Sequence, residues 1–338
     1  MDGMSAMIDM QGPLRVQHTL RTAIDCVGIG VHSGKQSRLV LRPAPVGTGI
    51  VFRRSDLGID IPARFDHVVD TMLCTVLGLP GRQDARVGTV EHVMAALAGL
   101  GISNAIVEVD GPEVPILDGS AASFVFLIDC AGIQEQAMPE RAIVVRRPVR
   151  VEHGDAVVEL RPTTGHAQMI VAMEIDFDDP AIGRQSLSLR ISETTFRREI
   201  AAARTFGRAA EVAALQAAGL ARGGSLENAV VVDGANVLNP GGLRMRDEFV
   251  RHKVLDAVGD IALAGAPVIG RVVGHKSGHA LNNRLLRALF ADDANWAWAE
   301  GIRMPAPSRA MALAEGSAGL PQLGSWQERR LPVAAAPV

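Results

Sequence analysis

Cysteine is scarce in this sequence, and its scarcity argues against two kinds of structure. The 338 residues include three cysteines, Cys26, Cys74 and Cys130, and no C-x-x-C pair. An odd number of widely separated cysteines argues against a disulfide framework and fits a reducing cytoplasm. Without a C-x-x-C pair, a zinc finger built from thiolates is not expected either. Tyrosine is absent altogether, which we attribute to compositional bias of the genome.

Long apolar runs and an excess of positive charge are also lacking. No apolar stretch reaches the roughly 18 residues that suggest a membrane span. Residues 1–14 carry neither a basic segment nor a long apolar core, so they do not resemble a signal peptide. The net charge of -3 and the pI near 6.3 show no excess of basic residues of the kind that binds nucleic acid. We therefore expect a cytoplasmic protein with no transmembrane segment and no nucleic-acid partner, and we expect a monomer.

What the chain does contain is a mixture of short strands and helices in each half. With 48% hydrophobic residues it is long enough for two domains with sizeable cores. Short apolar, β-favouring runs predict strands at 39–41, 105–109, 143–151, 156–160, 169–177, 229–232 and 268–273. Helical periodicity and helix stop signals predict helices at 90–100, 121–130, 209–218, 247–264 and 279–290.

The two halves also contain similar four-residue segments, HSGK at 32–35 and KSGH at 276–279. We predict an α+β fold made of a duplicated unit. The first domain would span 14–135 and the second 143–292, with the polar stretch 133–142 as the candidate linker between them. The tail at 303–338 is rich in Ala, Pro and Gly and has little periodicity, so it is expected to be disordered.

The longest predicted helix carries the first candidate site. His252 and Asp256 are four residues apart and share one helix face, and Asp260 continues that face by another turn. A histidine and a carboxylate at this spacing can chelate one divalent cation. Asp260 is then placed as an acceptor that orients the ligating histidine from behind. The alternative is an ordinary surface pair on an amphipathic helix.

A second candidate lies at the start of another predicted helix, where Glu91 precedes His92. A histidine that binds zinc beside a glutamate that acts as the base is a known arrangement in metal hydrolases. Alone, the pair is equally compatible with an exposed helix start. Together with His252 and Asp256, however, His92 completes three protein ligands, and a catalytic zinc leaves its fourth position open to water. Glu91 would then be the general base.

Three other segments offer further polar groups. His279 follows a glycine and opens a helix, where it can serve as a general acid or stabilise an oxyanion; the alternative is a solvated helix-start histidine. Thr205 precedes Phe206 and Gly207, and its hydroxyl can support an oxyanion, although a simple polar turn is the blander interpretation. Cys74 is interpreted as a small buried hydrophobe.

Nine segments of the chain, in one consistent order, resemble a known family. They are QHTLRTAIDCVGIGVHSGK, DTMLCTVLG, GTVEHVMAALAGLGISNAIVEVDG, PILDGSAASF, IDFDDPAIG, ARTFG, GGSLENAVVVD, VLNPGGLRMRDEFVRHKVLDAVGD and HKSGHALNNRLL. Between about Gln17 and Leu286 the sequence resembles the UDP-3-O-acyl-N-acetylglucosamine deacetylases, the zinc amidases of lipid A synthesis. The resemblance implies two layered α+β domains, with helices packed between sheets, that meet at the metal.

The resemblance also implies roles for individual residues. The zinc ligands would be His92, His252 and Asp256. The catalytic group would be Glu91 as base, His279 as acid, Thr205 beside the oxyanion, and Lys253 and Asp260 beside the metal. Lys253 has the alternative of being merely solvated. The substrate would be bound by Phe177 near the uridine, Lys276 near the diphosphate, and Phe206 and Gly224 in the matching ARTFG and GGSLENAVVVD segments.

The reaction implied removes the N-acetyl group of UDP-3-O-[(3R)-3-hydroxyacyl]-N-acetylglucosamine and releases acetate. An insert at about 209–232 would build a passage for the acyl chain, lined by Val212, Leu215 and Leu220, whose alternative is an ordinary buried helix face. Glu211 stands where relatives are expected to have Asp. Two alternatives to this function remain: another zinc amidase or peptidase with the same His/His/Asp site, and a non-catalytic module with a structural metal.

Overall fold

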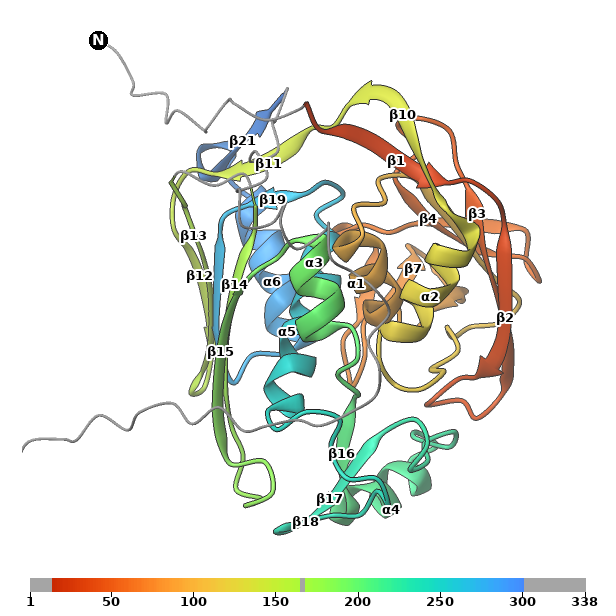
Figure 1. Cartoon of the computed structure of the whole chain (residues 1–338), viewed down its shortest axis with the longest axis vertical. Coiled ribbons are helices and arrows are strands. Elements are labelled where there is room, and N and C mark those ends of the chain that lie inside the picture. The colour runs from red at the N-terminus through yellow and green to blue at the C-terminus, as the bar shows by residue number, and fades with distance from the viewer. Residues whose placement is uncertain (1–13, 165–167, 301–338) are drawn as a thin grey trace, which may run out of the picture.

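Two five-stranded sheets with the same topology form opposite sides of the molecule (Figure 1). The computed structural model describes residues 14–164 and 168–300. The strands of the first sheet, in spatial order, are β2 (Ile24–Ile29), β3 (Gln36–Pro43), β9 (Ala105–Val109), β4 (Ile50–Arg54) and β5 (Ile59–Pro62). Those of the second are β12 (Val149–His153), β13 (Ala156–Arg161), β20 (Arg271–His275), β14 (Ile170–Asp176) and β15 (Arg184–Arg190).

In each sheet the third and fourth strands in this order are parallel, and the other neighbours are antiparallel. Two halves with the same strand order and the same pattern of directions confirm the predicted α+β fold with a duplicated unit. The domain limits at 14–135 and 143–292 stay a prediction. The tail predicted to be disordered, 303–338, lies outside the described residues.

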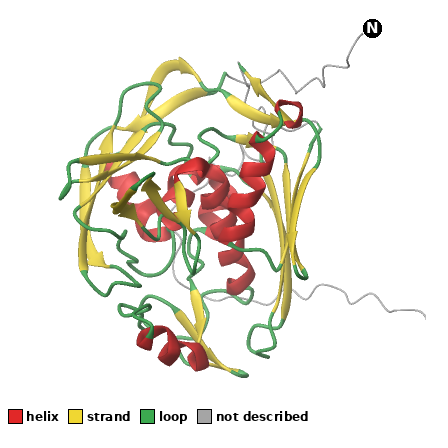
Figure 2. Ribbon diagram, turned by 180° about the vertical axis from the view of Figure 1, so that it is seen from behind, coloured by secondary structure: helices red, strands yellow, loops and turns green. Residues whose placement is uncertain are grey.

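The helices lie between the two sheets, as both views show (Figures 1 and 2). They are α1 (Glu91–Gly99), α2 (Ala122–Ala131), α5 (Glu248–Ala262), α6 (His279–Phe290) and the shorter α3 (Glu193–Thr195). The helix α4 (Ala209–Ala217) lies outside the two sheets. Three further short helices are η1 (Phe65–His67), η2 (Phe196–Ile200) and η3 (Asp293–Asn295). Within 14–164 and 168–300, no helix has the length and apolar character needed to cross a membrane.

The described part of the chain also forms four smaller sheets. They pair β1 (Val16–Leu20) with β10 (Ile133–Pro139), and β11 (Ala142–Val145) with β19 (Val268–Ile269) and β21 (Trp296–Ala299). The third contains β6 (Val68–Asp70), β7 (Val76–Leu79) and β8 (Arg82–Val87), and the fourth β16 (Phe206–Arg208), β17 (Val230–Asp233) and β18 (Asn236–Val237). The fourth sheet and α4 project together from one end of the molecule (Figure 1).

The candidate linker is mostly part of a sheet and not an unpaired connection. Most of it forms β10, which pairs antiparallel with β1. Its polar side chains have partners there, because Gln136 donates to the carbonyl of Ala44 and accepts from Asn104. Polarity alone therefore misled the interpretation of 133–139, since side-chain hydrogen bonds can satisfy a polar strand as well as water does.

Two of the predicted strands are each divided between two sheets. The run 143–151 separates into β11 and β12 around Pro148, which has no N–H to donate to a ladder. The run 268–273 separates into β19 and β20 at Gly270, where a Cβ would lie 2.7 Å from Cγ2 of Val145. Because β11 pairs with β19, the two breaks occur side by side in space.

The contact between α1 and α5 joins the two halves at the centre of the sandwich. Gly259 of α5 packs against the backbone carbonyl of Glu91, so closely that a Cβ on residue 259 would overlap the carbonyl oxygen. This close approach brings the first turn of α1 against the C-terminal half of α5. Both helices carry candidate site residues at that level.

Replacing Gly259 by alanine should therefore destabilise the protein, by about 1–3 kcal/mol or more, because the added methyl group overpacks against backbone. In an unconstrained helix the same change would stabilise by about 1 kcal/mol. Chemical denaturation of the variant and of Gly111→Ala, whose Cβ would meet no atom within 4 Å, measures the difference. Equal stability of Gly259→Ala and the parent protein would contradict the packing described here.

Candidate metal centre

Three buried side chains converge where α1 meets α5. One ligand atom from each of His92, His252 and Asp256 lies within 4.8 Å of the others. Nε2 of His252 is 3.2 Å and Nε2 of His92 is 3.7 Å from Oδ1 of Asp256. The side chains are at most 4% exposed. The structure thus brings together, from two halves of the chain, the three residues that the sequence resemblance pairs with zinc.

The chemistry of this group fits a divalent metal ion. Oδ1 of Asp256 is buried and has no hydrogen-bond partner within the part of the chain that the structure describes. Nδ1 of His252 lies 3.1 Å from the carbonyl oxygen of Ala203, which favours a proton on Nδ1 and a lone pair on Nε2. Two imidazoles and one carboxylate, with room for a further ligand, are typical of catalytic zinc.

The charge states also suit a metal site. Burial lowers the pKa of His252 to about 4, so its imidazole is neutral near pH 7. Burial alone would raise the pKa of Asp256, but the neighbouring His252 and Lys253 outweigh burial and hold it well below its usual range. A neutral histidine and an ionised aspartate are the forms in which these residues bind metal.

Lys253 is part of this cluster and does not project freely into solvent. Its Nζ donates to Oδ2 of Asp256 at 2.7 Å and lies 5.9 Å from the centre of the Phe206 ring. Burial alone would lower the pKa of the lysine, but Asp256 outweighs it and the pKa is raised. The lysine therefore stays charged. It donates to Oδ2 of Asp256, whereas both histidines lie near Oδ1.

A carboxylate and an imidazole lie next to the three ligands. Glu91 is 3% exposed, and its Oε1 is 3.9 Å from Nε2 of His279 at the start of α6. Burial raises the pKa of Glu91, which makes it a stronger base. Burial would lower the pKa of His279, but the negative charges of Asp260 and Glu91 outweigh it and raise the pKa to about 9. This arrangement presents an ionisable base and a protonated acid side by side.

Asp260 orients His279, and the expectation that it orients the ligating histidine is wrong. Its Oδ2 lies 2.9 Å from Nδ1 of His279, whereas the carbonyl of Ala203 takes the corresponding place at His252. Sequence spacing misled here, because residue 260 is two helical turns from residue 252 and nearer to α6 than to the metal ligands. Asp260 is 2% exposed and accepts hydrogen bonds on both oxygens.

Two polar residues without a predicted role complete this group. Thr75 donates from Oγ1 to Asp260 at 2.6 Å, and Asn282 donates from Nδ2 to Asp260 at 2.8 Å. Both lie in segments that carry the family resemblance, DTMLCTVLG and HKSGHALNNRLL. Their position inside these segments was the only signal that the sequence offered.

The predicted substrate-binding aromatics form a line that leads away from the ligands. The ring of Phe206 lies 6.3 Å from that of His252, and the ring of Phe177 lies 5.6 Å from Phe206. Phe177 directly follows β14, and Lys276 follows its parallel neighbour β20, so both lie at the same edge of the sheet. Nζ of Lys276 is 3.5 Å from Asp176 and 2.8 Å from Asp155.

Thr205 and Gly224 lie farther out. Thr205 stands between Ala203 and Phe206, both of which face His252, and its own N–H donates to the carbonyl of Gly119. Gly224 is exposed and directly follows Gly223, whose N–H donates to the carbonyl of Val31 in the first half. The structure thus places Thr205 near two residues that contact His252, and Gly224 beside a contact between the halves.

The segment predicted to form the acyl passage folds into α4 and β17, with a turn-rich stretch between them. Val212, Leu215 and Leu220 are half-buried, unlike the fully buried face of a core helix. Glu211 forms an ion pair with Arg208, which also reaches Asp179 at 3.4 Å. The longer side chain at 211 is therefore used in a local charge pair.

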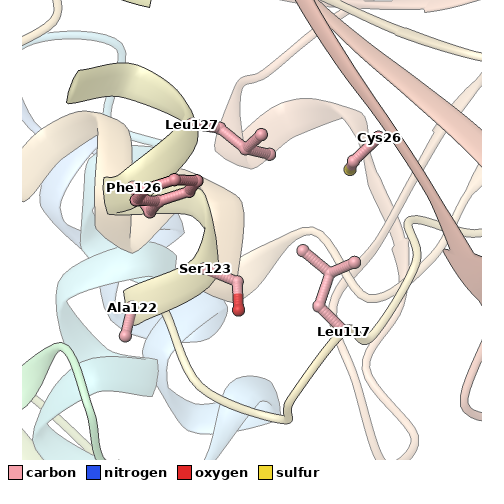
Figure 3. Close-up of a pocket in the computed structure, with 6 residues that line it drawn as sticks. All are labelled: Cys26, Leu117, Ala122, Ser123, Phe126 and Leu127. Carbon is pink, nitrogen blue, oxygen red and sulfur yellow. The ribbon is translucent and has the colours of Figure 1, made fainter. Parts of the chain in front are cut away.

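A separate hollow of about 360 Å³ lies between β2 and α2 (Figure 3). Its lining residues are Cys26, Leu117, Ala122, Ser123, Phe126 and Leu127, and none of them belongs to the metal cluster.

Burial, with a smaller effect of Asp25, raises the pKa of Cys26 to about 11. Burial and then Glu91 raise that of Cys74 to about 12. Both remain protonated thiols at neutral pH, in line with the expectation for Cys74.

Comparison with known proteins supports the same deacetylase family as the sequence resemblance. Residues 17–291 match the family of UDP-3-O-acyl N-acetylglycosamine deacetylases. A UDP-3-O-acyl-N-acetylglucosamine deacetylase of Acidithiobacillus ferrooxidans is 53% identical over 295 residues, which cover 86% of this chain and 95% of the relative. One of Anaeromyxobacter dehalogenans is 50% identical over 310 residues, 89% of this chain and 98% of the relative. The chain belongs to the UDP-3-O-acyl-N-acetylglucosamine deacetylase family.

Proposed function

We propose that this protein is a zinc-dependent deacetylase that hydrolyses the N-acetyl group of UDP-3-O-[(3R)-3-hydroxyacyl]-N-acetylglucosamine. The products are acetate and the free amine, and the reaction is the committed step of lipid A biosynthesis. The observation that carries the proposal is the buried convergence of His92, His252 and Asp256 beside an acid and a base. We further propose that the protein works as a cytoplasmic monomer.

Zinc held by these three residues would supply Lewis-acid chemistry that activates water and polarises the amide carbonyl. Glu91 accepts the proton of the attacking water, for which its buried position and raised pKa suit it. Its carboxylate is held by the N–H of Thr75, which donates to Oε2 at 3.0 Å. The base is thereby fixed on the side of the ligand cluster that faces His279.

His279 donates a proton to the leaving amine. The acid must carry its proton before the C–N bond breaks, and a pKa of about 9 keeps it protonated at neutral pH. We assign the hydroxyl of Thr205 and the ammonium group of Lys253 to stabilising the negative charge that develops on the carbonyl oxygen. Lys253 is already part of the cluster through Asp256.

Substrate recognition is assigned to the aromatic line and its edge of the sheet. Phe177 would stack near the uridine, Lys276 would contact the diphosphate, and Phe206 and Gly224 would contact the sugar and acyl portions. The acyl chain would follow the apolar side chains of the segment 209–232. These assignments rest on the placement of Phe177 and Lys276 at the ends of adjacent parallel strands.

An acetate-release assay with UDP-N-acetylglucosamine derivatives of several acyl lengths tests this function. We expect acetate release that depends on the 3-O-acyl chain and peaks at one length. N-acetylated peptides serve as the control for a zinc peptidase or general amidase. Acetate release from the peptides but not from the acylated UDP-sugar, or from neither, would refute the proposed substrate.

The rate should fall as pH rises through the pKa of His279, near 9, because the acid then loses its proton. Asp260→Asn removes the carboxylate that raises this pKa most, so the alkaline limb should move to lower pH. Profiles of kcat against pH for this variant, the parent and Asp247→Asn measure the shift. Asp247 lies next to α5 and pairs with Arg251, so its variant should keep the limb in place. An unmoved limb in Asp260→Asn would contradict the role given to His279.

A further inference from the structure

Thr75 contacts the proposed base, Glu91, and the carboxylate of Asp260 that orients the proposed acid. It lies in the loop between β6 and β7 and is 1% exposed. Its N–H donates to Oε2 of Glu91 at 3.0 Å, and its hydroxyl donates to Oδ1 of Asp260 at 2.6 Å. Its carbonyl accepts from the N–H of Val90 at 3.3 Å, just before α1 begins. One residue of the first half thus contacts the base and, across the interface, the carboxylate behind the acid.

We propose that Thr75 is a positioning residue that holds Glu91 and the Asp260–His279 pair in a fixed relation across the two halves. The inference rests on the proposed function, in which Glu91 is the base and His279 the acid. Thr75 itself need not touch substrate. It acts through the two carboxylates to which it donates.

The hydroxyl determines how the Asp260 carboxylate is turned. Oδ2 of Asp260 serves His279 and Asn282, and Oδ1 is held by Thr75. A short hydrogen bond from a hydroxyl to an ionised oxygen is among the stronger kinds in proteins. Without it, a buried oxygen loses its donor and the carboxylate gains freedom to rotate, so Oδ2 no longer faces Nδ1 of His279 in a single orientation.

The direction of this hydroxyl distinguishes it from an ordinary buried threonine. Buried hydroxyl groups usually donate to a nearby backbone carbonyl, as Thr19 does to Asn104 at 2.7 Å. Thr75 donates instead to a side chain 185 positions away in the sequence, on a helix of the other half. Its backbone N–H meanwhile holds Glu91, so the amide and the hydroxyl of one residue serve the two groups separately.

The test compares Thr75→Val, which keeps shape and N–H but removes the hydroxyl, with Thr75→Ser, which keeps the hydroxyl. We expect Thr75→Val to lower kcat by about 10- to 100-fold, as loss of an outer orienting partner does elsewhere, with little change in KM. Zinc content should stay at the parent level, and Thr75→Ser should recover most of kcat. Thr19→Val, which removes a buried hydroxyl of the same kind from β1, should keep the parent kcat.

Two further measurements separate positioning from general damage. In an Asp260→Asn background, Thr75→Val should cost far less than in the parent, since both changes remove the same orientation. In metal-free protein, the Nδ1 proton of His279 should exchange with water faster in Thr75→Val than in the parent or in Thr19→Val, as NMR can measure.

Several outcomes would overturn the proposal. They are an unchanged kcat in Thr75→Val, equal losses in the valine and serine variants, full additivity with Asp260→Asn, and loss of zinc or of folded protein in Thr75→Val. The last outcome would assign Thr75 a purely structural role. Failure of the parent protein to release acetate would instead refute the proposed function, and the exchange rate at His279 would still test the hydrogen-bond relation.

Discussion

Glu91→Gln is expected to lower kcat by about 10²–10⁴-fold, the usual contribution of a general base, while the protein keeps its metal. Glutamine has the same shape and can still accept the N–H of Thr75, but it cannot take a proton from water. The residue lies outside the proposed ligand set of His92, His252 and Asp256, so its change should leave metal binding intact. Loss of rate with unchanged zinc content is therefore the signature of the base.

The control is Glu193→Gln, which changes an exposed glutamate in the first turn of α3 that pairs with Arg197. This variant should keep both activity and zinc. Acetate release and zinc content measured on the same preparations test both expectations. If Glu91→Gln keeps most of the parent rate, the base lies elsewhere.

Loss of metal is the expected result of His252→Ala. The change leaves two protein ligands, and the carbonyl of Ala203 loses the imidazole that lies beside it. Because loss of an outer partner alone weakens metal binding by about 10- to 100-fold, loss of a ligand should weaken it by more than about 100-fold. Activity should fall in parallel and return only at high added zinc.

Zinc content after dialysis and acetate release as a function of added zinc measure this effect. His153→Ala is the matched control, because His153 is exposed at the end of β12. Parent-level zinc in His252→Ala would remove His252 from the ligand set, and with it the proposed centre between α1 and α5.

The sequence predicted the parts of this site that depend on local spacing. His252 and Asp256 share a helix face because they are four residues apart, and the structure keeps both on α5. The helix at 279–290 was predicted with the limits of α6, since Gly278 and the apolar periodicity mark it clearly. That His92 belongs with the α5 residues followed from the resemblance, because the close packing of Gly259 on Glu91 has no signature in local sequence.

Features that depend on tertiary contacts were missed or misassigned. The role of Thr75 arises because a loop of the first half meets α5 of the second, and spacing cannot reveal that contact. Asp260 serves His279 because α6 lies closer to it than His252 does. Likewise, 133–139 was interpreted as a linker because it is polar and because the partners of its Gln136, which are Ala44 and Asn104, are distant in sequence.

We propose that one metal ion, held between α1 and α5, makes this chain a sugar-nucleotide deacetylase. The most direct measurement is a titration of metal-free protein with zinc, with acetate release from acylated UDP-N-acetylglucosamine as the signal. We expect no release without metal and a plateau at about one zinc per chain, the stoichiometry of a single three-ligand site. Full activity in the metal-free protein, or no acetate at any zinc concentration, would contradict this proposal.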